Sequence, residues 1–206
     1  MTRRQLALTV FSLGLISIIL GSQKRIPPNA LPKKPGLAIG DSLTVHGRWI
    51  ARYKELSGQD WEKVAIQGWT SKRALMDLPT VELVRYATVA VLLGANDFVN
   101  DGLSAAATIR NLTAIYQAAR AAGATVVGIV PTPFAGYVRA RPVHIEKWHT
   151  VCDWIRREAP VDFVVETAPL GDSSGRLLPE YASGDGLHLS NAGQQRLGEL
   201  VYETLR

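Results

Sequence analysis

Five residues of this chain have side chains or backbone groups suited to acyl transfer. Ser42 carries a hydroxyl, and Asp185 and His188, spaced i, i+3, pair a carboxylate with an imidazole. Gly68 and Asn96 supply a close backbone N–H and a side-chain amide. Acyl transfer needs a nucleophile, a base, a group that orients the base, and donors for an oxyanion. These residue types therefore predict nucleophilic catalysis, provided that the fold brings them together.

Short apolar runs alternate with helical patterns from Gly36 onward. We expect strands at residues 37–39, 64–66, 88–93, 125–130 and 162–165. Helical patterns cover residues 46–57, 71–85, 103–122 and 143–158, and a last helix begins near Ser190. Strands that alternate with helices predict βαβ units, and therefore a parallel sheet with right-handed crossovers.

In such a sheet, functional groups collect at the carboxyl ends of the strands. Ser42 follows the first expected strand, Gly68 the second and Asn96 the third. Asp185 and His188 lie in the loop between the fifth strand and the last helix. We therefore expect all five residues at one edge of the sheet.

This order of motifs resembles the SGNH (GDSL-type) hydrolase family, named for its Ser, Gly, Asn and His. Gly40-Asp41-Ser42-Leu43 is similar to the first family block, Gly94-x-Asn96-Asp97 to the third and Asp185-x-x-His188 to the last. Gly68 stands where the family has its second block, and the resemblance spans residues 36–206. It implies an α/β fold, a three-layer α/β/α sandwich around a five-stranded, mostly parallel sheet with a flavodoxin-like strand order.

The resemblance, together with the chemistry of the residues, implies a serine esterase that works without a cofactor. Ser42 would attack the carbonyl carbon, His188 would take its proton, and Asp185 would orient the imidazole. The oxyanion hole would consist of the N–H groups of Ser42 and Gly68 and the amide of Asn96. The short loop at residues 131–137 favours an open site and small acyl groups.

The expected substrate is a small-molecule, glycan or lipid ester, and two alternatives stay open. One is an acyltransferase or deacetylase that acts on cell-envelope glycans, with a sugar hydroxyl in place of water in the transferase. The other is a non-catalytic, membrane-tethered binding domain. The full set of Ser42, Asn96, Asp185 and His188 argues against the binding domain, because binding alone does not need all four.

Several neighbouring residues have structural interpretations. Ser42 could merely cap a helix and His188 could be a surface residue, although the presence of their partners disfavours both interpretations. We expect Asp41 and Asp97 to hydrogen-bond the backbone of their turns. His46 is a candidate for the pocket wall.

Three further residues belong to the helical pattern at 143–158. His144 and His149 flank its apolar stripe and are expected to be solvated, whereas Cys152 lies on the stripe and is expected in the core. No His, Cys, Asp and Glu grouping has the spacing of metal ligands, so no metal is expected.

Residues 171–175 form a second candidate nucleophile motif, because they match G-x-S-x-G around Ser173. That motif needs a helix directly after the serine. Pro179 follows within a few residues and prevents such a helix, so we expect a surface loop.

The chain has 206 residues and a net charge of +5, but six basic residues and no acidic ones lie in residues 1–35. The remainder is close to neutral, which argues against a nucleic-acid partner. Arg3-Arg4 followed by the apolar residues 6–20 indicates a signal peptide or membrane anchor at residues 1–22, with a buried core helix as the alternative. A Pro- and Lys-rich linker at 23–35 would join it to a hydrolase domain at 36–206, exported and touching the membrane only through the N-terminal segment.

Overall fold

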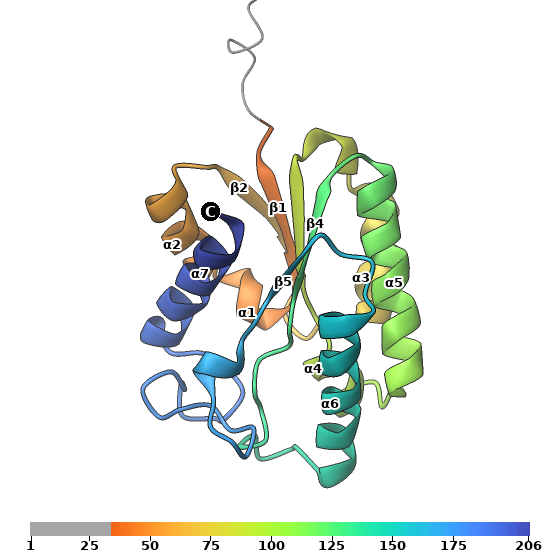
Figure 1. The fold of residues 1–206 in the computed structure, drawn as a ribbon. Coiled ribbons are helices and arrows are strands. Elements are labelled where there is room, and N and C mark those ends of the chain that lie inside the picture. Colours follow the sequence, from red (N-terminus) through yellow and green to blue (C-terminus); the bar gives the residue numbers. More distant parts are fainter. Residues whose placement is uncertain (1–33) are drawn as a thin grey trace, which may run out of the picture. The chain divides into compact units, whose positions relative to one another are not determined.

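The structure is a computed structural model that describes residues 34–206, and Figure 1 shows their path. Five strands form one sheet in the order β2-β1-β3-β4-β5, and every pairing is parallel. The strands are β1 (Gly36–Gly40), β2 (Trp61–Ala65), β3 (Thr88–Leu92), β4 (Thr125–Ile129) and β5 (Phe163–Val165). This confirms the expected five-stranded parallel sheet, with the flavodoxin-like order.

Helices cover both faces of the sheet. The helices are α1 (Ser42–Val45), α2 (Arg48–Ser57), α3 (Ser71–Asp77), α4 (Ala95–Val99), α5 (Ala105–Ala121), α6 (Pro142–Arg157) and α7 (Asn191–Leu205). Three short 3-10 turns complete the described elements: η2 (Leu78–Thr80), η3 (Leu83–Arg85) and η4 (Ala168–Leu170). Helices α1, α2 and α7 pack on one face, and α3 to α6 pack on the other (Figure 1). The fold is therefore the expected three-layer sandwich.

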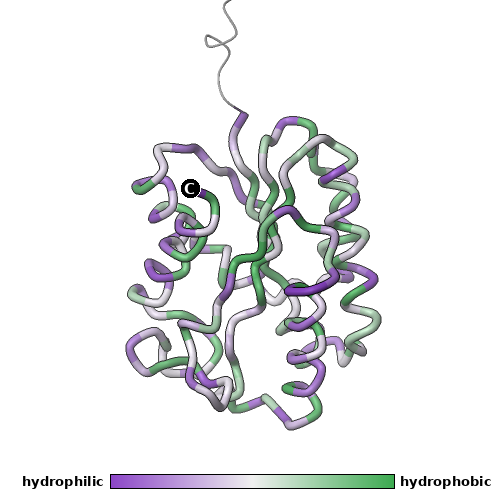
Figure 2. Tube along the Cα trace, in the orientation of Figure 1, coloured by the Kyte–Doolittle hydropathy of each residue, from purple (hydrophilic) through white to green (hydrophobic). Residues whose placement is uncertain are grey.

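The strands supply both cores, because alternate side chains point to opposite faces. In β1, Leu37 and Ile39 join the core under α5 and α6, whereas Ala38 joins the core under α2 and α7. All three are buried, as are their neighbours in β3 and β4. Figure 2 shows the apolar residues gathered along these central strands, with polar residues on the outer sides of the helices.

Several predicted elements differ from the structure in extent, two of them markedly. The helix expected at 71–85 ends at Asp77 and continues as η2 and η3. Pro79 explains this, because proline has no N–H to donate to the preceding turn. The second strand lies at Trp61–Ala65 instead of 64–66, and Ile66 beyond it is 51% exposed.

The predicted signal peptide or anchor at residues 1–22 lies outside the described residues, as does nearly all of the linker at 23–35. In the described part of the chain, no helix combines the length and apolar character needed to cross a membrane. Export and membrane contact stay predictions.

Helix α7 lies directly against α2, as the adjacent blue and brown ribbons of Figure 1 show. Gly198 permits this approach, because a Cβ there would lie 2.5 Å from the carbonyl oxygen of Trp49 and 2.7 Å from Cβ of Arg52. Gln194 adds two polar links, with its Nε2 donating to the carbonyl of Leu43 at 2.9 Å. Its Oε1 accepts from the N–H of Trp49 at 3.3 Å. The packing thus holds the start of α7 next to α1.

We expect Gly198→Ala to lower the free energy of unfolding by about 1–3 kcal/mol, because the added methyl group forces α7 away from α2. The sign of this change is informative. Alanine usually stabilises a helix interior by about 1 kcal/mol relative to glycine, so a loss of stability here reports on the close packing. Urea denaturation measures the change. Gln195→Ala, at an exposed position of the same helix, is the control and should shift stability by less than about 0.5 kcal/mol. A Gly198→Ala variant as stable as the wild type would contradict the close packing.

Candidate active site

The first element of the candidate site is the turn between β1 and α1. Gly40 ends the strand, and a Cβ there would clash with the side chain of Thr44 one turn later. Asp41 caps α1, with its Oδ1 accepting from the N–H of Leu43 at 3.0 Å. Ser42 is therefore the first residue of α1, with its hydroxyl at the carboxyl edge of the sheet, as expected.

The loop before α7 brings His188 to this hydroxyl. Nε2 of His188 lies 3.0 Å from Oγ of Ser42, and Nδ1 of His188 lies 2.6 Å from Oδ2 of Asp185. The N–H groups of Leu187 and His188 donate to Oδ1 of Asp185 at 2.9 and 2.8 Å. Gly186 has a φ of +74° and packs so closely on Gly136 that a Cβ would clash with its carbonyl. A short, tightly hydrogen-bonded loop thus positions both side chains.

Asp185 is anionic over the working pH range of most proteins. Desolvation alone would raise its pKa, but the hydrogen bonds from the imidazole and N–H of His188 and from the N–H of Leu187 outweigh it. Together with the nearby imidazole they hold the pKa of Asp185 well below its usual range. An anionic carboxylate at Nδ1 keeps the proton on that nitrogen and leaves Nε2 free to accept a proton from Ser42.

The other two predicted oxyanion donors, Gly68 and Asn96, lie next to Ser42 around one pocket. Asn96, the second residue of α4, is 8% exposed, and its Nδ2 donates to Oδ2 of Asp41 at 2.9 Å. Its Oδ1 accepts from Nδ2 of Asn100 at 2.8 Å, so both ends of the amide are held. Gly68 has a φ of +75°, a conformation that favours glycine. Ser42, Gly68, Asn96 and His188 together line a pocket of about 160 Å³.

Asp41 has a second role that sequence reasoning missed. We expected it to bond only backbone, but it also fixes the orientation of the Asn96 amide. Asp41 is fully buried, and burial raises the pKa of its carboxyl to about 6, against the opposing effects of the Leu43 N–H and of His188. The sequence contained a hint of this second role. Asp41 stands directly before Ser42 in the G-D-S-L motif, and a carboxylate in that position needs hydrogen-bond donors.

Asp97 plays the structural part expected of it, although it does more than form a turn. Its buried carboxylate accepts from the N–H of Ser71 at 2.8 Å and from Oγ1 of Thr108 at 3.0 Å. Oγ of Ser71 donates to it as well. Asp97 thereby ties α4 to α3 and α5, which holds the neighbouring Asn96 in place.

The prediction for one histidine was wrong. His144 is buried rather than solvated, because the guanidinium of Arg141 lies against its ring and donates to Nε2 from two nitrogens. His149 is exposed and Cys152 is buried, as expected. Burial raises the pKa of the Cys152 thiol to about 12, so this thiol is not a nucleophile at neutral pH. His46 lines a second pocket next to Ser42.

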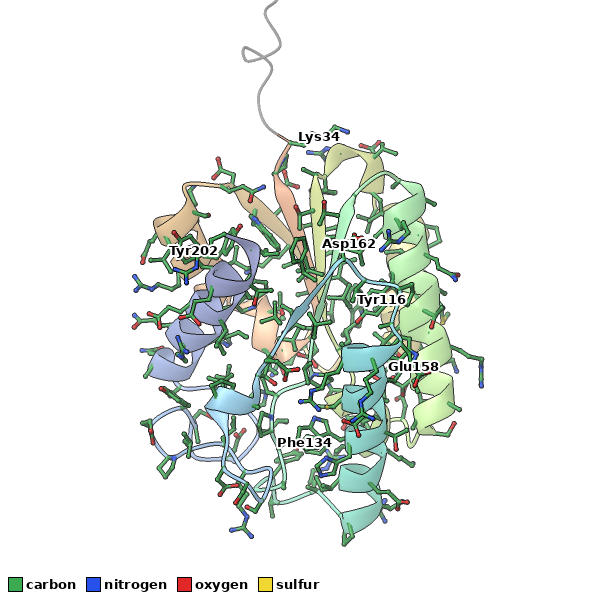
Figure 3. The ribbon with its side chains drawn as sticks, viewed as in Figure 1. Lys34, Tyr116, Phe134, Glu158, Asp162 and Tyr202 are labelled. Carbon is green, nitrogen blue, oxygen red and sulfur yellow. The ribbon has the colours of Figure 1, made fainter. Side chains whose placement is uncertain are left out.

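The loop after β4 also contributes to the site. Phe134, labelled in Figure 3, is fully buried and packs edge-on against Trp148 of α6 with ring centroids 6.1 Å apart. This contact anchors the loop, and Tyr137 and Arg139 beyond it line the 160 Å³ pocket.

The motif around Ser173 is a surface loop. Gly171 and Leu177 form an antiparallel bridge at its base, and Asp172 accepts from the N–H groups of Ser174 and Arg176 at 2.9 and 3.0 Å. No strand–turn–helix is present at residues 171–179, so the alternative nucleophile lacks its required context. Within residues 34–206, no group of three or more His, Cys, Asp or Glu side chains could hold a metal ion.

Comparisons with known proteins identify the family and agree with the fold. A family model, described as the GDSL-like Lipase/Acylhydrolase family, matches residues 38–196. Esterase TesA of Pseudomonas aeruginosa is 29% identical over 204 residues, which cover 94% of this chain and 95% of that protein. A crystal structure of TesA matches with a TM-score of 0.66 and 28% identity over 84% of this chain and 98% of that one. A GDSL-like lipase from Bacteroides thetaiotaomicron shares the fold, with a TM-score of 0.71 and 20% identity over 82% and 86% of the two chains.

The raised pKa of Asp41 predicts a measurable pH dependence of stability. The folded state binds this proton more tightly than the unfolded state, whose carboxyl has the ordinary pKa of 3.8. The resulting stabilisation is complete below that value and is lost as the pH rises through about 6. Relative to Asp41→Asn, the wild type should lose about 2–3 kcal/mol of unfolding free energy between about pH 4 and pH 7.

Urea denaturation of both proteins at closely spaced pH values measures this difference. Asparagine keeps an acceptor for the N–H of Leu43 and does not titrate. The contributions of the other ionisable groups therefore largely cancel in the difference between the two proteins. A constant difference across the range would show that the Asp41 carboxyl titrates at its ordinary pKa.

Proposed function

Because the chain belongs to the GDSL-like lipase/acylhydrolase family, we propose that it hydrolyses carboxylic esters with small acyl groups through an acyl-enzyme on Ser42. Activity on ester bonds follows from the family; the residue roles and the acyl preference are the proposal. The observation that carries it is the hydrogen-bonded series from Oγ of Ser42 through the imidazole of His188 to Oδ2 of Asp185.

Acylation begins when Oγ of Ser42 attacks the ester carbonyl carbon. His188 accepts the hydroxyl proton at Nε2, and the anionic Asp185 stabilises the imidazolium that forms. Collapse of the tetrahedral intermediate breaks the bond to the alcohol oxygen, which takes the proton from His188 as it leaves. Water then repeats the sequence on the acyl-enzyme and releases the acid.

Three donors would hold the negative oxygen of both intermediates: the N–H groups of Ser42 and Gly68 and the second amide proton of Asn96. One amide proton of Asn96 already goes to Asp41, so its orientation exists before substrate binds. Preorganised donors stabilise the transition state without reorganising during the reaction. Asp41 is thus a positioning residue for the proposed oxyanion hole.

The size of the pocket supports a small acyl group. At about 160 Å³ it is well below the roughly 300–1,000 Å³ typical of pockets for drug-sized ligands. A larger depression of about 740 Å³ lies beyond Gly68, between α3 and Leu103, and shares Gln67 and Gly68 with the small pocket. The proposal places a short acyl group in the small pocket alone.

The glycan acyltransferase alternative uses the same first step and differs only in the acceptor that replaces water. The relatives described above are an esterase and a GDSL-like lipase, so hydrolysis is the function we propose. An extracytoplasmic location also belongs to this proposal, and it rests on the sequence of residues 1–22 alone.

Reaction of the protein with a fluorophosphonate probe tests the nucleophile. The probe modifies serines that a neighbouring base activates, so we expect labelling at Ser42 and loss of labelling in His188→Ala. Peptide mapping by mass spectrometry locates the modification. Ser173→Ala is the matched control and should label like the wild type. Labelling at Ser173, or undiminished labelling of His188→Ala, would contradict the proposed roles, and absence of labelling would favour the binding-domain alternative.

The acyl preference is tested separately with p-nitrophenyl esters of increasing chain length. We expect kcat/KM to be highest for two to four acyl carbons and to fall by about tenfold or more at eight, because longer chains exceed the small pocket. An optimum at ten or more carbons would contradict the proposal and would indicate that the chain extends into the depression beyond Gly68.

A further inference from the structure

The second pocket beside Ser42 has no role in the steps described so far. We propose that it binds the alcohol portion of the ester and that His46 and Gln67 select alcohols with additional hydroxyl groups, such as glycerol or a sugar. The pocket has a volume of about 300 Å³. This inference rests on the proposed function of Ser42.

The positions of the donors assign the two pockets. Ser42 and His188 border both pockets, but Gly68 and Asn96 border only the smaller one. The carbonyl oxygen has to face these donors, which places the acyl group in the smaller pocket. The alcohol oxygen has to receive its proton from Nε2 of His188, which borders both pockets. Because the acyl group fills the smaller pocket, the alcohol extends into the 300 Å³ pocket.

Part of the polar wall of this pocket is already occupied by internal hydrogen bonds. Both ends of the Gln194 carboxamide bond to backbone, to the carbonyl of Leu43 and the N–H of Trp49. Oγ of Ser183 donates to Oδ1 of Asp185 at 3.2 Å. These groups shape the pocket and have little capacity left for a ligand.

His46 and Gln67 differ from Gln194 and Ser183 in their hydrogen bonding. Both are exposed, and neither side chain has a hydrogen-bond partner among residues 34–206. His46 belongs to the alcohol pocket alone, whereas Gln67 lies at the boundary and borders the acyl pocket too. An imidazole and a carboxamide both donate and accept, so together they can bind hydroxyl groups in either role.

The remaining wall narrows the chemistry of the alcohol. No Lys or Arg lines the pocket, so an anionic headgroup would lack a permanent positive charge to pair with. Its two leucines, Leu43 and Leu189, are only 4% and 8% exposed, so the aliphatic side chains of the wall offer an alkyl alcohol little surface. Neutral hydroxyl groups next to the ester fit this combination best.

The assignment can be tested on the acyl-enzyme itself. An alcohol bound in this pocket gives its proton to Nε2 of His188 while its oxygen attacks the acyl carbon. The bond from that carbon to Oγ of Ser42 breaks, and Oγ takes the proton back. This reverses the leaving step, so the ability of an added alcohol to compete with water reports on the alcohol pocket.

We therefore expect wild-type protein turning over p-nitrophenyl acetate to acetylate glycerol about five- to tenfold more readily than 1-propanol at equal concentration. Chromatography of the acetylated alcohols and of acetate gives the two partition ratios. His46→Phe keeps a ring of similar size but cannot hydrogen-bond, and it should reduce the preference for glycerol to about twofold or less. His46→Gln should retain most of it. His149→Ala, at an exposed histidine of α6 outside the pocket, should keep the wild-type ratio.

Three outcomes would overturn the proposal. The wild type could show no preference for glycerol, or the preference could survive in both His46→Phe and Gln67→Ala. Either result, with p-nitrophenol release intact, would reject the alcohol pocket while leaving the esterase function in place. Absence of p-nitrophenol release together with absence of fluorophosphonate labelling would reject the function, and the alcohol pocket with it.

Discussion

The site depends on the close packing of α7 against α2. Ser42 and His188 are separated by 146 positions in the chain, yet their functional atoms are 3.0 Å apart. Ser42 begins the segment that leads into α2, and His188 ends the loop that leads into α7, so the contact between these helices sets the distance between the two side chains. Gly198 allows the backbones to approach, and Gln194 fixes their register by bonding to Leu43 and Trp49. The hydrogen bond between the proposed nucleophile and the proposed base is thus a consequence of core packing on one face of the sheet.

On the opposite face of the sheet, the proposed oxyanion donor Asn96 is positioned by other means. Asp97 bonds to α3 and α5 and thereby fixes α4, which carries Asn96. Asp41 then joins Asn96 of α4 to the turn between β1 and α1, which carries Ser42. This bond links the helix layers on the two faces of the sheet. A buried carboxylate is costly unless hydrogen bonds compensate it, and Asp41 and Asp97 each accept at least two. Both acids of the turns therefore support the proposed site by holding neighbouring groups in place.

The residues that sequence reasoning located are those whose neighbours along the chain already restrict their conformation. Ser42 follows an apolar run and a glycine, and Asp185 and His188 share one short loop, so local patterns suffice to place them at the sheet edge. The five strands were predictable for the same reason. The burial of His144, the link from Asp41 to Asn96 and the end of β2 depend on segments far apart in the chain. Periodicity cannot reveal such contacts, because it describes which face a residue occupies and not what packs against that face.

The two sides of Ser42 differ in exposure, and the proposed chemistry requires that difference. Asp41 and Asn96 are buried, so hydrogen bonds to an oxyanion there act in a medium of low dielectric, where they are strongest. The side chains of His188 and Asp185 are 36% and 42% exposed. An exposed imidazole can receive the water that deacylation consumes and can release a proton with the departing alcohol. Burying His188 as deeply as Asn96 would strengthen its hydrogen bonds but would obstruct the path of water and alcohol. A rigid, buried set of oxyanion donors and an exposed base therefore suit the acylation and deacylation steps of the proposed reaction.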